Sequence, residues 1–373
     1  MSKVPFDDTL LPAAEWRGRF RRRLRAWYRR HARDLPWRSS DDAFHIWVSE
    51  IMLQQTQVST VKPYFLRFVS RFPTIADLAK AEERDVMRLW EGLGYYRRAR
   101  QLHKAAREVM AKHDGVVPRD SAQLQSLPGI GRYTAGAIAS IAFDAREPIL
   151  EANTIRLLAR LLGYQGDTRS APGQALLWDF ARAVLPRNSV GEFNQALMEL
   201  GSLVCKPKAP DCHSCPARSL CAALAQGKQD QIPIPPKKAD YEAVREAAIV
   251  VRRNGRILLR QCEPGERWSG LWDFPRVRLD NAEGVPPTRE LVLKVRQLTD
   301  VSVRSLRHVK TIKHGVTRFS ITLDCYEGEG VSGVAANRRG RLKWLWPKQL
   351  DQYPLSSTGR KLARFVFRDS GAA

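Results

Sequence analysis

Four closely spaced cysteines constrain this chain more than any other feature. They follow the pattern C-x6-C-x2-C-x5-C and occupy positions Cys205, Cys212, Cys215 and Cys221. Clustered thiolates are soft ligands that bind a zinc ion or an iron–sulfur cluster, and disulfides are the alternative in an oxidising compartment. Zinc sites usually pair two short CxxC arms across a longer loop, whereas this chain has one such arm between longer intervals. The segment is therefore expected to fold around a metal centre.

The charge of the chain indicates a polyanionic partner. Its 373 residues carry 62 Lys and Arg against 39 Asp and Glu, which gives a formal net charge of +23. Nucleic acid is favoured over a membrane surface, because the nearest candidate anchor, residues 20–31, has the pattern of a basic surface helix with an apolar stripe. No secretory signal or membrane-spanning stretch is recognisable. We therefore expect a cytoplasmic protein, associated with the nucleoid if its source is bacterial, that does not contact a membrane.

The length of the chain and a change in its periodicity predict two domains. Before residue 226 the apolar residues recur at helical spacing, which predicts an all-α domain over residues 1–225. Residues 226–243 are polar and rich in proline, as is typical of a linker. Residues 244–373 are expected to form a smaller α/β domain, with strands near residues 248–251, 256–259 and 319–326 and a helix near 288–298.

The string LPGIGRYTAG at residues 127–136 predicts a tight turn between two helices. Gly129 and Gly131 permit the turn, and the amides at the start of the second helix would form an anion site suited to a DNA phosphate. A GxG pair alone is more often only a turn. The complete string, however, resembles the helix-hairpin-helix of the DNA glycosylase superfamily.

Several further motifs occur in one order along the chain. They are WVSEIMLQQTQV at residues 47–58, LGYY at 93–96, the hairpin, FNQA at 193–196 and the cysteine segment. Together they resemble the adenine DNA glycosylase (MutY-type) family of the endonuclease III superfamily. The resemblance extends from about residue 27 to residue 221, and less strongly to the C-terminus. It implies a monomeric base-excision-repair enzyme that removes adenine opposite 8-oxoguanine or guanine in duplex DNA, and a [4Fe–4S] cluster on the four cysteines.

Two carboxylic acids are the candidates for hydrolysis of a glycosidic bond. Glu50 lies within the apolar string FHIWVSEIML, which would raise its pKa if the side chain is buried rather than exposed to solvent. The resemblance implies that Glu50 is the general acid. The family reads ILDGN where this chain reads ILEAN at residues 149–153, so Glu151 stands in place of the catalytic aspartate, followed by Asn153. Asp144 is the less favoured candidate for this second carboxylate.

Tyr133 indicates the type of reaction. The endonuclease III branch carries a lysine at this position, which attacks the sugar and forms a Schiff base. A tyrosine has no amine, so a glycosylase that uses water as its final nucleophile is expected. A tyrosine that only packs at this position predicts the same missing lyase activity.

Other roles follow from the resemblance by position. The pocket for the extruded adenine would be lined by Arg33, Leu35, Trp37, Arg38 and Gln195. Contacts with DNA would come from Leu53, Gln55, Tyr95, Gly129, Gly131 and Thr134. For Leu53 and Tyr95, ordinary packing in the protein core is the alternative.

The second domain resembles the C-terminal Nudix-like module of the same family, most clearly in the string WSGLWDFP at residues 268–275. It lacks the paired glutamates that hold magnesium in an active Nudix hydrolase, because Glu290 is followed by Leu293 and Lys294. Binding without hydrolysis is therefore expected. In the string HGVTR, His314 and Thr317 stand where the family reads 8-oxoguanine, although a threonine in a strand has a structural explanation too.

Because Glu151 departs from the aspartate of the family, the motifs are compatible with more than one substrate. Besides adenine excision, a sister glycosylase for another mismatched base, such as thymine opposite guanine, fits the motifs. A DNA-binding iron–sulfur protein without catalysis is the third interpretation. Each of them predicts double-stranded DNA that contains a mismatch as the partner.

Overall fold

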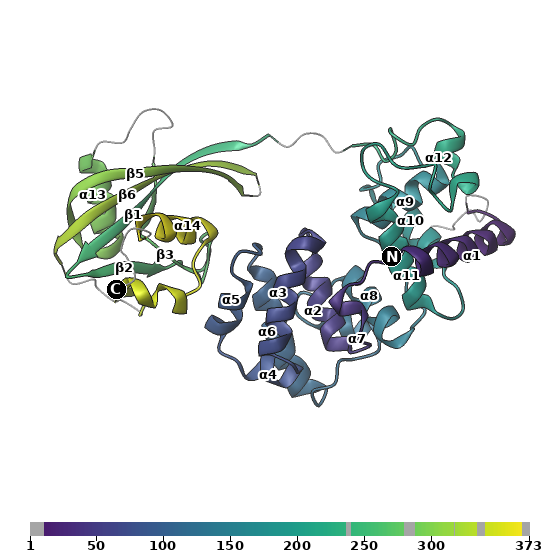
Figure 1. The fold of residues 1–373 in the computed structure, drawn as a ribbon, viewed down its shortest axis with the longest axis horizontal. Coiled ribbons are helices and arrows are strands. Elements are labelled where there is room, and N and C mark those ends of the chain that lie inside the picture. Colours follow the sequence, from purple (N-terminus) through teal and green to yellow (C-terminus); the bar gives the residue numbers. More distant parts are fainter. Residues whose placement is uncertain (1–10, 236–239, 280–287, 317, 334–339, 368–373) are drawn as a thin grey trace. The chain divides into compact units, whose positions relative to one another are not determined.

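The chain folds into two compact units. The computed structural model describes residues 11–235, 240–279, 288–316, 318–333 and 340–367. The first unit joins residues 1–80 to residues 100–237, and the second joins residues 81–99 to residues 238–373. Helices build the first unit, and the second contains a β-sheet with helices (Figure 1). The expected helical domain followed by an α/β domain is confirmed.

Helices build the first unit around buried apolar side chains. Their bounds are α1 (Ala14–His31), α2 (Ala43–Leu53), α3 (Val58–Arg71), α4 (Ile75–Lys80), α6 (Arg97–Lys112, of which residues 97–99 belong to the second unit), α7 (Ser121–Ser126), α8 (Arg132–Phe143), α9 (Ala152–Leu162), α10 (Ala171–Val184), α11 (Val190–Leu203) and α12 (Ala222–Ala225), with 3-10 turns η2 (Pro36–Arg38) and η3 (Arg218–Leu220). Helices α1, α9, α10 and α11 supply most of one apolar core cluster of this unit.

Helix α1 buries one face and exposes its arginines. Phe20, Leu24, Trp27 and Tyr28, at helical spacing, join the core formed with α9, α10 and α11. The expected basic surface helix is therefore confirmed. Among the described helices, none combines the length and the apolarity that a membrane crossing requires.

Helices α8 and α11 approach each other closely at Gly191. A Cβ atom at this position would lie 2.5 Å from the carbonyl oxygen of Ser140 and 2.9 Å from the Cα of Ile141. Asp144 ends α8 in the left-handed conformation, with φ of 53°, and its carboxylate accepts hydrogen bonds from the backbone N–H groups of Ser189 and Gly191. The carboxylate of Asp144 thus caps the start of α11. The close contact at Gly191 fixes α8 against α11, and both helices carry residues of the pocket described below.

A mixed sheet forms the centre of the second unit. Its elements are α5 (Glu83–Trp90), β1 (Glu242–Arg253), β2 (Arg256–Gln261), β3 (Trp272–Asp273), β4 (Arg276–Arg278), α13 (Thr288–Thr299), β5 (Ser302–Val316), β6 (Phe319–Ser332), β7 (Leu342–Leu345), η4 (Pro347–Gln352) and α14 (Ser357–Val366). The strand order is β3-β2-β1-β6-β5, with β4 paired to β1 and β7 paired to β2. Strands β1 and β6 are parallel, and every other described pair is antiparallel.

Strand β1 is buried on both faces of the sheet. Ala247, Ile249 and Val251 pack with α13, whereas Ala248 and Val250 face the cluster that includes α14. This alternation of side chains explains why β1 appears in the sequence as a continuous apolar run.

Strand β5 lies at the edge of the sheet, and its antiparallel pairing with β6 is interrupted at three places. The pairing register shifts between Ser302 and Val303, between Arg304 and Arg307, and between His308 and Lys310. Most of its side chains are exposed or half-buried. The first shift places an extra residue on β6 and the other two each place one on β5, and such bulges twist the paired strands locally.

The predicted linker is only partly extended. Ile232 is buried in the core of the first unit, and its carbonyl accepts a hydrogen bond of 2.8 Å from Nε of Arg160. Strand β1 already begins at Glu242, before the predicted end of the linker at residue 243. Burial of one isoleucine outweighs the polar and proline-rich composition around it.

Substitution of Gly191 tests the contact between α8 and α11. We expect Gly191→Ala to destabilise the chain by about 1–3 kcal/mol, because the added methyl meets backbone atoms that cannot move independently. Gly18→Ala is the matched control. Its Cβ would meet only a mobile arginine side chain inside α1, so it should be neutral or stabilise by up to ~1 kcal/mol. Urea unfolding followed by far-UV circular dichroism measures both, and equal stabilities would contradict the close contact.

Candidate active site

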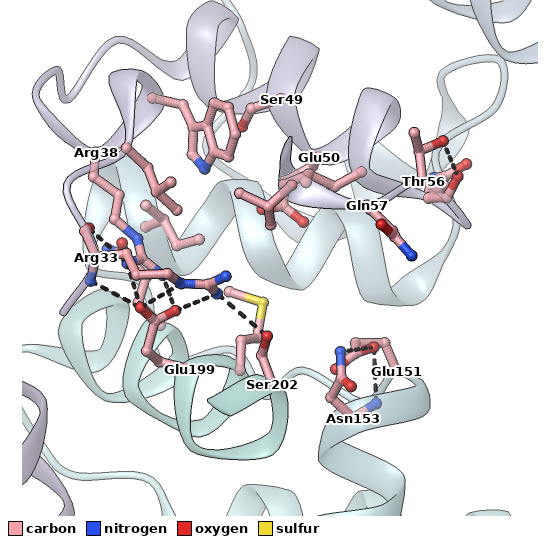
Figure 2. Close-up of a pocket in the computed structure, with 18 of the residues that line it drawn as sticks. Arg33, Arg38, Ser49, Glu50, Thr56, Gln57, Glu151, Asn153, Glu199 and Ser202 are labelled. Carbon is pink, nitrogen blue, oxygen red and sulfur yellow. Dashed lines mark hydrogen bonds and ion pairs between the residues drawn. The ribbon is translucent and has the colours of Figure 1, made fainter. Parts of the chain in front are cut away.

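One cavity of the first unit, with a volume of about 820 Å³, gathers most of the residues that the sequence singles out. It lies among α2, α8, the start of α9 and α11, and Figure 2 shows the side chains that line it. Predicted residues at its wall are Arg33, Leu35, Trp37, Arg38, Glu50, Leu53, Gln55, Tyr133, Glu151, Asn153 and Gln195. Segments far apart in the chain therefore converge on one pocket.

Glu50 is buried at the wall of this pocket, with 4% of its surface exposed. Because α2 is apolar on nearly all sides, its carboxyl group has lost most of its water. Burial raises the pKa of Glu50, a hydrogen bond from Tyr133 partly opposes the rise, and the result is about 7. The solvent-exposed alternative for Glu50 is therefore wrong.

Tyr133 reaches the pocket from the first turn of α8. Its hydroxyl donates to Oε2 of Glu50 over 2.7 Å and lies 3.3 Å from the sulfur of Met198. Burial raises the pKa of Tyr133 well above its usual value, and the neighbouring Glu50 and Glu151 act in the same direction. The phenol therefore remains a hydrogen-bond donor near neutral pH.

Glu151 occupies the N-cap of α9. Its carboxylate accepts hydrogen bonds from the backbone N–H of Asn153 at 2.9 Å and of Thr154 at 3.0 Å, while the Thr154 hydroxyl accepts from the N–H of Glu151 at 2.8 Å. Burial raises the pKa of Glu151, and the backbone hydrogen bonds oppose that effect. The additional methylene therefore still leaves its carboxylate at the helix N-terminus, where negative charge is favoured.

Asn153 connects this cap to the cysteine segment. Its side-chain nitrogen donates to Oε2 of Glu151 over 3.3 Å, and its oxygen accepts from Arg156 over 2.9 Å. Arg156 also donates to the backbone carbonyl of Cys205 over 2.7 Å. A chain of hydrogen bonds thus joins the carboxylate of Glu151 to the first cysteine of the cluster.

Arg33 and Arg38 converge on Glu199, which the sequence interpretation missed. Glu199 accepts from the Arg33 guanidinium at 2.8 and 2.9 Å and from the Arg38 guanidinium at 2.8 and 3.2 Å. Burial alone would raise the pKa of Glu199, but these hydrogen bonds lower it to about 2. Its position one helical turn after Gln195 on α11 is the signal that could have identified it. In Figure 2 this group lies on one side of the pocket and Glu151 on the other.

The remaining pocket residues complete a mostly apolar wall. Leu35 and Trp37 are buried beside the pocket, and the Trp37 ring packs edge-on against Phe65 with 5.4 Å between ring centroids. The side-chain oxygen of Gln195 accepts a hydrogen bond of 3.3 Å from Tyr28. The pocket thus presents apolar surface with a few fixed polar groups, as is usual for a ligand site.

The predicted DNA-contacting residues are distributed differently. Leu53 and Gln55 line the rim of the pocket, and Gln55 is exposed with φ of 55°. Tyr95 belongs to the second unit and is 50% exposed, so core packing does not explain it. Thr134 is buried, and its hydroxyl accepts from Gln54 over 3.3 Å. Any contact of Thr134 with DNA is therefore left to its backbone.

The predicted helix-hairpin-helix is present. Helices α7 and α8 are joined by residues 127–131, with Gly129 at φ of 80° and Gly131 at the N-cap of α8. A Cβ at Gly129 would lie 2.6 Å from the Cβ of Gln101, so the turn requires glycine for both conformation and space.

The four cysteines border one small apolar cavity. Cys205 follows α11, Cys221 precedes α12, and Cys212 and Cys215 lie on the segment between them. Arg160 is buried at this cavity and places Nη1 3.3 Å from the sulfur of Cys205. In the described part of the chain, no three Cys, His, Asp or Glu side chains are arranged to hold a single metal ion.

The candidate lesion-reading residues lie on the second unit. His314 is on β5, and both of its ring nitrogens are buried. Burial lowers the pKa of His314, and the nearby Arg276 acts in the same direction. Thr317 lies outside the described residues.

Two protein-family models match this chain. The model of the HhH-GPD superfamily base excision DNA repair protein matches residues 48–181, which include Glu50, the hairpin and Glu151. A NUDIX domain model matches residues 246–364. The second domain is therefore Nudix-like, as the sequence predicts.

Similar proteins agree with these matches. A rat protein named adenine DNA glycosylase is 35% identical over 92% of this chain and 77% of its own length. One of the same name from Buchnera aphidicola (subspecies Acyrthosiphon pisum) is 35% identical over 68% of this chain and 72% of its own length. A solved thermostable thymine-DNA glycosylase superposes with a TM-score of 0.53 and 28% identity, over 57% of this chain and 98% of that one. The chain is a DNA N-glycosylase of base excision repair and belongs to the adenine DNA glycosylase family.

Proposed function

We propose that this protein is a monofunctional adenine DNA glycosylase that hydrolyses the N-glycosidic bond of adenine paired with 8-oxoguanine or guanine. The observation that carries the proposal is the buried Glu50, with a pKa of about 7, in a pocket that also holds Glu151. One carboxylic acid that is protonated near neutrality and one carboxylate held at a helix N-terminus supply the two groups that glycosidic hydrolysis needs.

Glu50 would act as the general acid. Its proton passes to the purine ring of the flipped adenine, and the bond between the sugar and the base then breaks with its electron pair on the base. The hydroxyl of Tyr133 donates to Oε2 of Glu50, which leaves the other oxygen to carry the proton toward the base. Tyr133 would in this way orient the acid.

Glu151 would stabilise the sugar cation that forms as the base leaves. Its carboxylate is fixed by Asn153 and Thr154, so it need not reorganise when the positive charge develops. Water would add to the anomeric carbon and yield free adenine and an abasic site. A tyrosine at position 133 supports water rather than a protein amine as the nucleophile.

The polar groups of the pocket suit a base with both donors and acceptors. Gln195 and the Arg33–Arg38–Glu199 group lie beside the apolar surfaces of Leu35 and Trp37, where a purine ring would pack. Glu199 stays ionised because its pKa is about 2, so it would hold the guanidinium groups of Arg33 and Arg38 in place beside the base.

DNA would be held by backbone amides and by side chains that replace the flipped base. The N–H groups at the start of α8, after the glycine turn, suit a phosphate. Leu53 and Gln55 at the pocket rim and the exposed Tyr95 would enter the base stack beside the extruded adenine. The net charge of +23 supports double-stranded DNA as the partner.

A [4Fe–4S] cluster would be held by Cys205, Cys212, Cys215 and Cys221. These thiols border one apolar cavity, and clustered soft thiolates are the ligands that iron–sulfur clusters take. When bound, the cluster would cross-link the segment that packs against α9. Metal analysis of the anaerobically purified protein tests this assignment. We expect iron and sulfide, and stoichiometric zinc without iron would contradict it.

The Nudix-like domain would read the base opposite adenine. The candidates are those that the resemblance implies, and they include His314, close to the end of β5. Thr317, outside those residues, keeps its proposed role from the resemblance alone.

A panel of lesion duplexes tests the function. We expect alkali-sensitive cleavage at adenine opposite 8-oxoguanine, slower cleavage at adenine opposite guanine, and none at thymine opposite guanine. Borohydride should trap no efficient covalent adduct, because no lysine occupies position 133. Thymine release would favour the sister mismatch glycosylase, and binding without release of any base would favour the non-catalytic interpretation.

The pKa of Glu50 predicts a pH dependence of catalysis. Glu50 must be protonated to act, so the single-turnover rate should fall as the pH rises through about 7. Glu151 must be ionised, so a second loss is expected on the acidic side, at a higher pH than for an ordinary carboxyl group because its pKa is raised. Glu50→Gln should lower the rate at least about a hundredfold. A rate that does not change with pH near neutrality would show that another group donates the proton.

Variants at Glu151 test the second carboxylate. Glu151→Gln should bind the lesion duplex but release adenine at least about a hundredfold more slowly, because the lost charge is needed mainly in the transition state. Glu151→Asp should keep measurable activity, since aspartate is a good N-cap residue. Asp42→Asn, at the N-cap of α2, is a control that removes a carboxylate from another helix start. Single-turnover rates and gel-shift affinities separate catalysis from binding, and a fully active Glu151→Gln variant would overturn the assignment.

A further inference from the structure

The second unit contains a nearly buried ion pair between helix α14 and the residue that follows α5. Glu91 is the C-cap of α5, and Arg360 belongs to the first turn of α14. The guanidinium donates to both carboxylate oxygens, at 2.6 Å from Nε and 3.0 Å from Nη2. The two side chains are only 7% and 11% exposed.

Both partners of this pair are held by further contacts. Glu91 also accepts from the backbone N–H of Leu355 at 3.1 Å and from Arg88 at 3.0 Å. Arg360 also donates to the carbonyl of Tyr353 at 2.9 Å and to the carboxylate of Asp351 at 2.9 Å. A two-pronged arginine–carboxylate contact of this kind fixes direction as well as distance.

The energetic contribution of the ion pair between Glu91 and Arg360 depends on its burial. An ion pair exposed to water contributes little. Here the removal of one partner would leave an unpaired charge away from solvent, which is strongly unfavourable. The pair therefore holds residue 91 firmly against the segment that includes η4 and the start of α14.

The loop that begins after Glu91 is conformationally unusual. Gly92 and Gly94 have positive φ values of 100° and 73°, and Tyr95, which is half exposed, has φ of 47°. The carbonyl of Gly94 accepts from the indole of Trp90 at 3.2 Å, and the N–H of Gly92 donates to the hydroxyl of Tyr96 at 3.1 Å. These hydrogen bonds tie the loop to Trp90 and Tyr96, close to Glu91 in the chain.

We propose that Arg360 is a positioning residue for the loop at residues 92–96. By holding Glu91, α14 of the Nudix-like domain sets where the loop presents Tyr95. The Nudix-like domain, which is proposed to read the base opposite adenine, is then joined firmly to the loop that carries Tyr95. This proposal rests on the proposed role of Tyr95 in DNA.

The experiment uses full-length protein and four variants: Arg360→Ala, Glu91→Ala, the double variant, and Arg364→Ala as the control. Arg364 is an exposed arginine one turn later on α14. Two quantities are measured on a duplex with adenine opposite 8-oxoguanine: the single-turnover rate, and the fluorescence of 2-aminopurine placed beside the mispair, which reports unstacking. Hydrogen exchange of the amides of residues 91–96 is measured without DNA.

We expect Arg360→Ala and Glu91→Ala each to lower the excision rate and the fluorescence change between roughly tenfold and a hundredfold, the range for a misplaced group far from the chemistry. The double variant should match the worse single variant, because both substitutions remove the same contact. Amide exchange in residues 91–96 should accelerate in all three and remain unchanged in Arg364→Ala.

Three outcomes would overturn the proposal: effects that multiply in the double variant, an Arg360→Ala variant that matches Arg364→Ala in exchange, or faster exchange with unchanged fluorescence and rate. If Arg360→Ala unfolds the Nudix-like domain, Glu91→Gln replaces it, since that change leaves α14 intact. If wild-type protein releases no adenine, the proposed function fails, and the contact is then judged by hydrogen exchange and fluorescence alone.

Discussion

The N-terminus of α9 is the point on which the candidate active site depends. There the carboxylate of Glu151 receives two backbone N–H groups, and the residue returns its own N–H to Thr154. A cap of this kind begins the helix and, at the same time, fixes a largely buried carboxylate at the wall of the pocket. In the proposed mechanism, folding and catalysis use the same hydrogen bonds, and the charge is in place before substrate arrives.

Helix α9 also connects the pocket to the cysteine segment. One turn after the cap, Arg156 binds both the side chain of Asn153 and the carbonyl of Cys205, and one turn further Arg160 approaches the sulfur of Cys205. Arginine suits these contacts because its planar guanidinium satisfies several acceptors at once while remaining charged. The cysteine segment and the reacting centre thus share one structural element.

Much of the site could be predicted from the sequence, because the chemistry is concentrated in short motifs. Glu50, Tyr133 and Glu151 lie within such strings, and all three line the same cavity. Glu199 could not be identified in this way, since its role depends on two arginines far away in the chain that meet it only in the folded state. Asp144 shows the reverse case, because a carboxylate close to the catalytic segment in sequence proves to cap α11. The composition of the linker likewise did not reveal the buried Ile232.

Strand β5 carries a consequence for the behaviour of the protein in solution. A long strand at the edge of a sheet has backbone groups that another chain could pair with, and such edges promote aggregation. The register shifts along β5 interrupt the flat row of donors and acceptors that an incoming strand would need. Arg304 and Arg307, each paired with a glutamate on β6, and Lys310 add bulky charged groups along the same edge. Within the described residues, the edge of β5 thus carries features that disfavour strand pairing with another copy of the chain.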